Sequence, residues 1–174
     1  MNFNRLLLLL ALAASLGFAP GSARAQVSEA AVKAAFLPKI VRYIDWPARA
    51  VAPGAPLQIC IVGSDPFGRL IDEAIAGQTL GDHAMSVRRG GSLDGCQVAF
   101  LAGSVAPRAI AVLKGRPVLT VTDSRGGTTR GMIHFAPKGP RVSFHIDDAQ
   151  AAQSGLGISA RLLAIALSVR SRSQ

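Results

Sequence analysis

Three short apolar runs constrain the fold of this chain more than any other feature. They lie at residues 57–62, 97–102 and 117–122, each with glycine or proline close by. Runs of this kind are typical of buried strands, and a weaker pattern at 83–89 predicts an edge strand. The segments after the first run and between the second and third have helical periodicity. This alternation predicts a single α/β domain whose mixed, mostly parallel sheet has about six strands flanked by helices.

The C-terminal half contains the signature of an antiparallel hairpin. Residues 132–136 and 141–146 alternate in hydrophobicity around Lys138-Gly139-Pro140. Placing the apolar side chains on the core face pairs position 133 with 146 and position 135 with 144. In this register His134 faces His145 on the outer surface. Two histidines without a third firm ligand indicate a solvated cross-strand pair or a weak metal site, and we predict no metal.

Helices are expected at both ends of the domain. Residues 28–44 carry apolar side chains on one helical face, and Pro38 predicts a kink or local break near Leu37 because proline lacks an N–H donor. Asp147 and Asp148 can begin a short helix. Residues 158–169 predict a buried closing helix, with Leu162, Ile165 and Val169 on one side.

The first 25 residues have the pattern of a removable export signal. A basic residue at Arg5 precedes an apolar run, and the triplet Ala23-Arg24-Ala25 predicts cleavage before Gln26. An uncleaved anchor is the alternative. Cleavage leaves residues 26–174 as one domain and lowers the formal net charge from +9 to +7. The cations are mostly scattered singly, which argues against nucleic-acid binding, and no later run is long enough to span a membrane.

The two cysteines lie in neighbouring strands of the predicted sheet. Cys60 is within the first strand and Cys96 immediately precedes the third. Because export places thiols in an oxidising compartment, we expect a disulfide between them. A redox-active pair is an alternative, although there is no Cys-x-x-Cys motif, and two free buried thiols are another.

No motif in the chain predicts catalysis, and we expect neither a catalytic centre nor a cofactor. There is no Gly-x-Ser-x-Gly elbow, and the paired acids are adjacent in sequence, so their side chains point apart. The loop from Gly63 to Gly68 joins a strand to a helix, where α/β folds bind anions. Ser64 and Asp65 are therefore either helix caps or contacts for a small anionic ligand.

An aromatic face on the opening helix is the other candidate binding feature. Phe36, Tyr43 and Trp46 lie close to the cations Lys39 and Arg42. These side chains either pack onto the sheet or leave part of the face exposed to bind a protein, since tryptophan, tyrosine and arginine are common anchors of interfaces.

Four segments carry a resemblance that covers nearly all of the chain after the signal. They are Lys33-Ala34-Ala35-Phe36-Leu37 running to Tyr43-Ile44-Asp45-Trp46-Pro47; Ile59-Cys60-Ile61-Val62-Gly63-Ser64-Asp65-Pro66-Phe67-Gly68; Gly115-Arg116-Pro117-Val118-Leu119-Thr120-Val121-Thr122-Asp123; and Gly131-Met132-Ile133 through Arg141-Val142-Ser143-Phe144-His145-Ile146 to Ile158-Ser159-Ala160-Arg161-Leu162-Leu163. In order and spacing, these segments resemble the YfiR family of exported bacterial proteins.

The resemblance implies a periplasmic regulator without a catalytic centre. Relatives repress a membrane diguanylate cyclase by binding its periplasmic sensor domain, and an outer-membrane lipoprotein relieves the repression, which raises cyclic di-GMP and biofilm formation. Relatives are dimers, and a family disulfide matches Cys60 and Cys96. A second cysteine pair found in some relatives is absent here. Arg42 and Arg161 are candidate contacts, as exposed cations near plausible binding faces.

Two hypotheses from other classes accompany this one. The first is a carrier or sensor of a small anionic ligand, bound at residues 64–68 and favoured by the positive net charge. The second is a hydrolase or metal enzyme. The three differ in whether the chain acts through contact with a protein, through a bound small molecule, or through a reactive group.

Overall fold

The computed structural model describes residues 28–138 and 141–172. The predicted export signal, its cleavage site and the hairpin turn at 139–140 lie outside these residues. Within the two described ranges, none of the helices has the length and apolar character needed to cross a membrane.

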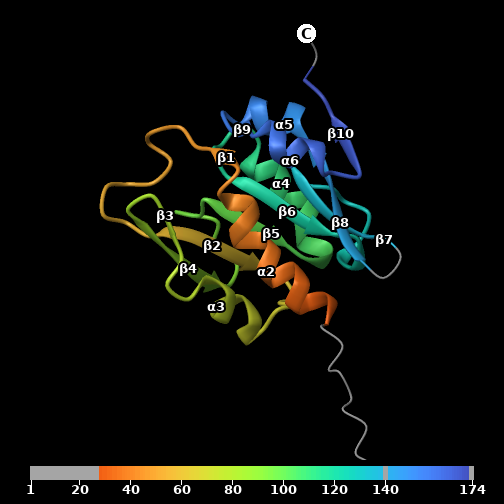
Figure 1. Cartoon of the computed structure of the whole chain (residues 1–174), viewed down its shortest axis with the longest axis horizontal. Helices are drawn as coiled ribbons and strands as arrows, with labels where there is room; N and C mark the ends of the chain where they lie inside the picture. Colours follow the sequence, from red (N-terminus) through yellow and green to blue (C-terminus); the bar gives the residue numbers. More distant parts are fainter. Residues whose placement is uncertain (1–27, 139–140, 173–174) are drawn as a thin grey trace, which may run out of the picture.

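An eight-stranded mixed sheet forms the centre of the domain, as Figure 1 shows, in the order β10-β8-β7-β6-β5-β2-β4-β3. Pairing is antiparallel between β7 and β8 and between β3 and β4, and parallel elsewhere. The strands are β2 (Leu57–Val62), β3 (Thr79–Leu80), β4 (His83–Arg89), β5 (Val98–Leu101), β6 (Leu119–Asp123), β7 (Ile133–Lys138), β8 (Arg141–Asp147) and β10 (Ser168–Arg170). The predicted fold class is confirmed, with two more strands than the six expected.

Helices cover both faces of the sheet. One face packs on α2 (Glu29–Val41), α3 (Arg69–Ile75), α5 (Asp148–Gln153) and α6 (Ala160–Ala164), and the other on α4 (Ala106–Leu113) (Figure 1). The side chains of β2 follow this division, because Ile59 and Ile61 join the first core whereas Cys60 and Val62 join the second. Two-residue strands β1 (Ile44–Asp45) and β9 (Gly157–Ile158) pair beside the sheet, and the 3-10 turns are η1 (Gly103–Val105) and η2 (Ser124–Gly126).

The hairpin has the predicted register. Ile133 lies opposite Ile146, Phe135 opposite Phe144 and His134 opposite His145. The pairing continues to Lys138 and Arg141. Because strand side chains alternate between faces, burial of the apolar set on one face excludes a register shifted by one residue.

The predicted closing helix is wrong over most of its length. Residues 157–158 form β9, α6 covers only Ala160–Ala164, and residues 168–170 form the edge strand β10, parallel to β8. Ile165, expected on the buried face of that helix, is 61 % exposed. Hydrogen bonding to the free edge of β8 therefore prevails over the helical spacing of the apolar residues.

The opening helix is uninterrupted at Pro38, so the predicted local break is wrong. Helix α2 begins after Ser28, whose hydroxyl accepts a hydrogen bond from the Ala31 N–H, and continues through the proline to Val41. Leu37 and Ile40 are buried in the core on either side of Pro38. Their packing onto the sheet offsets the backbone hydrogen bond that proline cannot donate.

The predicted disulfide between Cys60 and Cys96 is present. It links β2 to a position two residues before β5 on the face covered by α4, across a sequence separation of 36. On the chain-entropy estimate such a link stabilises the fold by about 4 kcal/mol.

A buried ion pair fixes α2 on the sheet. Lys33 is only 2 % exposed, and its Nζ donates to Asp123 Oδ2 at 2.5 Å and also to Glu29. Arg125 Nε donates to the other oxygen of Glu29 at 2.8 Å, and these bonds, from Arg125 first and Lys33 second, lower the pKa of Glu29 to about 2. The cluster joins the first turns of α2 to the end of β6.

We predict that Lys33→Met destabilises the domain by roughly 3–5 kcal/mol, because the Asp123 carboxylate then stays buried without its cation. Urea unfolding measures this loss. The double variant Lys33→Met/Asp123→Asn removes the unpaired charge, and the side-chain oxygen of the new asparagine can still accept the hydrogen bond from the Arg125 backbone N–H. It should therefore recover more than half of the lost stability. A single variant as stable as the wild type contradicts the role given to the pair.

Candidate functional site

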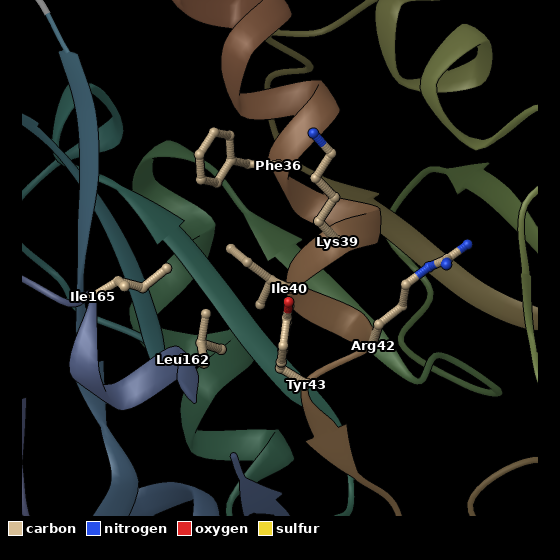
Figure 2. A pocket seen from close by; sticks show the side chains of 7 residues that line it. All are labelled: Phe36, Lys39, Ile40, Arg42, Tyr43, Leu162 and Ile165. Carbon is tan, nitrogen blue, oxygen red and sulfur yellow. The ribbon is translucent and has the colours of Figure 1, made fainter. Parts of the chain in front are cut away.

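A groove of about 450 Å³ lies between α2 and α6. Figure 2 shows the seven side chains that line it, five from α2 and the turn after it and two from α6 and its end. They are Phe36, Lys39, Ile40, Arg42, Tyr43, Leu162 and Ile165. Five of the seven are apolar or aromatic, and none is acidic.

Burial differs between the floor and the rim of the groove. Ile40 and Leu162 belong to the core and form the floor. Tyr43 is 40 % exposed and Ile165 is 61 % exposed, and they form part of the rim. The described residues hold only one other exposed large hydrophobic side chain, Val112 on α4. Two of these three side chains therefore border the same groove, and such clustering is typical of a binding surface.

The local sequence explains why these side chains meet. Positions 36, 40 and 43 are spaced so that they share one side of a helical segment, next to the residues that pack α2 onto the sheet. On the opposite wall, α6 is short and the chain turns at Ile165 towards β10, which brings Ile165 out of the core. The groove is thus the seam left where a long helix and a short helix cover neighbouring parts of one sheet.

Two cations give the groove a positive border. Lys39 Nζ lies 5.9 Å from the centre of the Phe36 ring, within the range of a cation–π contact. Arg42 Nη2 donates to Gln78 Oε1 at 2.6 Å, and in Figure 2 its guanidinium points away from the apolar side chains. The site therefore combines an apolar floor with positive charge along the α2 side. It can bind an apolar group flanked by a carboxylate.

Of the binding face predicted on the opening helix, all but Trp46 line the groove, namely Phe36, Lys39, Arg42 and Tyr43. Arg161 is exposed on α6 but is not part of the lining. Trp46 is half-buried against the core, where its Nε1 has no hydrogen-bond partner among the described residues. The aromatic and basic face predicted for the opening helix therefore forms one side of the groove, whereas Trp46 packs against the core instead.

Ser64 and Asp65 line a different cavity, of about 290 Å³, at the carboxyl ends of the parallel strands. Asp65 Oδ1 accepts hydrogen bonds from the N–H groups of Phe67 and Gly68, and its other oxygen pairs with Arg89 at 2.7 Å. The backbone donors expected to hold an anion are therefore occupied by this carboxylate. Asp65 caps a turn and not α3 itself, which begins at Arg69.

The histidines face each other as predicted, but they are not a solvated pair. His134 is 4 % exposed and its Nδ1 lies 2.8 Å from Thr122 Oγ1, while His145 Nδ1 lies 2.6 Å from Ser168 Oγ. Burial, with a contribution from Arg130, lowers the pKa of both imidazoles. In the part of the chain that the structure describes, no three His, Cys, Asp or Glu side chains gather in a way that could hold a metal ion.

Ile165 is the groove residue that sequence reasoning placed wrongly. The sequence predicts Leu162 and Ile165 on the buried side of one closing helix; Leu162 is buried in α6 as predicted, whereas Ile165 lies beyond the end of α6 and is exposed. The serine at position 168 and the arginines at 170 and 172 alternate with smaller or apolar residues. This alternation was the one signal of a strand, and it is too short to outweigh the helical pattern before it.

Comparison with protein families identifies the chain. The sequence profile described as YfiR/HmsC-like matches residues 30–167, a range that contains every residue of the groove. The chain belongs to the YfiR/HmsC-like family. A search of curated proteins found no match to the chain. Membership agrees with a regulatory protein of the periplasm, and the disulfide fits an oxidising compartment.

The lowered pKa of His134 predicts a specific pH dependence of stability. Because the folded state binds the proton more weakly than the unfolded state, stability is complete above the unfolded pKa, about 6.5, and falls as the pH drops below it. We expect the melting temperature of the wild type to fall between pH 7 and pH 5. His134→Gln should flatten this decline, whereas His83→Gln, at the other end of the sheet, should preserve it. An equally steep decline in His134→Gln contradicts the assignment.

Proposed function

We propose that this YfiR/HmsC-like protein is a periplasmic regulatory binding protein that represses a membrane diguanylate cyclase. It binds the periplasmic sensor domain of the cyclase and lowers cyclic di-GMP signalling. Family membership supports this function, and the groove between α2 and α6 is the observation that supports a site for it.

The composition of the groove fits a protein partner. Tyr43 and Ile165 are exposed apolar side chains beside a buried floor, an arrangement in which a partner's side chain can be fully desolvated. Lys39 and Arg42 favour a partner segment that carries carboxylates, because opposite charges at the rim speed and orient association. The proposed segment of the sensor domain is therefore apolar with acidic residues at its edge.

Repression requires a difference in affinity between the two states of the sensor. A protein that binds the active and inactive states equally shifts nothing, however tightly it binds. Moving the sensor from 1 % to 99 % inactive needs roughly 10⁴-fold tighter binding to the inactive state. We propose that the groove is complementary to a segment that the inactive sensor exposes and the active sensor rearranges.

The wider pathway is part of the same proposal. The domain formed by residues 26–174 acts in the periplasm after removal of the export signal, and a homodimer is the proposed assembly. An outer-membrane lipoprotein releases the sensor, so that cyclic di-GMP and biofilm formation rise. The chain itself contributes binding and no chemical step.

A pair of matched substitutions tests the site. Ile165→Glu places a charge on the rim of the groove and should weaken binding to the purified sensor domain by about tenfold or more, measured by calorimetry. Val112→Glu makes the same change at a similarly exposed position on the other face of the sheet, where Val112 is 53 % exposed, and should leave affinity unchanged.

The same two variants can be followed in cells. Ile165→Glu should raise cyclic di-GMP towards the level of the deletion strain, whereas Val112→Glu should not. Equal affinities for the two variants would remove the groove from the proposal. A sensor domain that does not bind the wild type at all would remove the proposed function itself.

A further inference from the structure

Arg88 lies directly beside the disulfide, on the face of the sheet opposite the groove. It is the partner of Cys60 in the parallel pairing of β4 with β2. Its Nη2 lies 3.2 Å from Cys96 Sγ and 3.4 Å from Cys60 Sγ. The same nitrogen donates to the backbone carbonyls of Ser92 and Asp94, in the loop that leads into Cys96.

No carboxylate neutralises this guanidinium within the described residues. Among those residues, the ion pairs of this loop and of β4 are made by arginines other than Arg88. Arg89 pairs with Asp65 and Asp72, and Arg116 pairs with Asp94. Arg88 is half-buried, so water screens its charge less than that of an exposed arginine. The sulfur atoms and two carbonyls are therefore its contacts.

How strongly Arg88 stabilises the two sulfur atoms depends on their redox state. A disulfide sulfur is neutral and a weak acceptor, whereas a thiolate is a full charge and accepts a much stronger, charge-assisted bond. Cations close to cysteine favour the thiolate. Arg88 thus stabilises the reduced, ionised pair more than it stabilises the disulfide.

We propose that Arg88 is a positioning residue that makes the Cys60–Cys96 disulfide reducible by a dithiol. One thiolate of the reductant attacks Cys96 Sγ, forms a mixed disulfide with it and expels Cys60 Sγ as a thiolate beside Arg88. The second thiolate of the reductant then displaces Cys96. The protein gains two electrons, and Cys60 and Cys96 become thiolates or, after taking up protons, thiols. The dithiol is oxidised to a disulfide.

The loop of residues 90–95 determines whether a reductant can reach the disulfide. Cys60 is 1 % exposed and Cys96 is 4 % exposed, so a reductant cannot reach either without local opening. Residues 90–95 include three glycines, and every residue in this loop except Leu93 is exposed. Cys96 follows this loop whereas Cys60 lies inside the central strand β2, which is why attack occurs at Cys96. Opening the loop exposes the attacked sulfur and leaves Arg88 with the expelled one.

The test measures the equilibrium between the protein and dithiothreitol buffers at pH 8, with thiols counted by alkylation and mass. Arg88→Met should make the disulfide about tenfold harder to reduce, a shift of ~30 mV. Arg88→Lys should retain most of the wild-type behaviour. Arg116→Met, which removes a partly buried cation that pairs with Asp94 of the same loop, should behave as the wild type.

A purely structural role for Arg88 predicts the opposite sign. Losing its bonds to Ser92 and Asp94 would loosen the loop and make the disulfide easier to reduce. In the reduced protein, alkylation of Cys60 should moreover require a higher pH in Arg88→Met than in the wild type. A disulfide in Arg88→Met that is reduced as readily as, or more readily than, that of the wild type overturns the proposal, as does an unchanged pH profile of alkylation.

Discussion

The buried pair of Lys33 and Asp123 is the interaction on which the position of the groove depends. A lysine in the core is stable only with its charge satisfied, so α2 must present position 33 to the end of β6. This fixes the rotation of the helix about its axis. Phe36, Ile40 and Tyr43, one to three turns further along, are then directed towards α6. The position of the groove is thus a consequence of how charge is buried at the opposite end of the helix.

Much of the fold is predictable because its signals are local. The central strands are apolar runs between chain-breaking residues, and the alternation in the hairpin allowed a register that is correct at each predicted pair. The missed elements are β1, β3, β9 and β10, each of two or three residues. Strands this short exist only because a neighbouring strand offers hydrogen bonds. For β1, β9 and β10 that neighbour is distant in sequence, whereas β3 pairs with β4 across a short turn. Residues 168–170 joined β8 in this way instead of continuing a helix.

The candidate site was predictable on one side only. The aromatic and basic residues of α2 share a helical face, so Phe36, Tyr43 and Arg42 could be singled out from their spacing. The opposite wall, Leu162 and Ile165, depends on where α6 ends, which the unpredicted strand β10 determines. For Ser64 and Asp65 the sequence left a cap and an anion site as alternatives, and only the contacts favour the cap. The carboxylate of Asp65 accepts hydrogen bonds from the N–H groups of Phe67 and Gly68, and it pairs with Arg89.

We propose that this YfiR/HmsC-like protein acts through contact, at the seam between α2 and α6. Hydrogen–deuterium exchange of the intact protein, alone and saturated with the cyclase sensor domain, separates this surface from the others. We expect slower exchange on binding at residues 36–43 and 160–167, with β4 and α4 unchanged. Protection confined to β4, α4 or the loop at 90–95, with none at the groove, would contradict it.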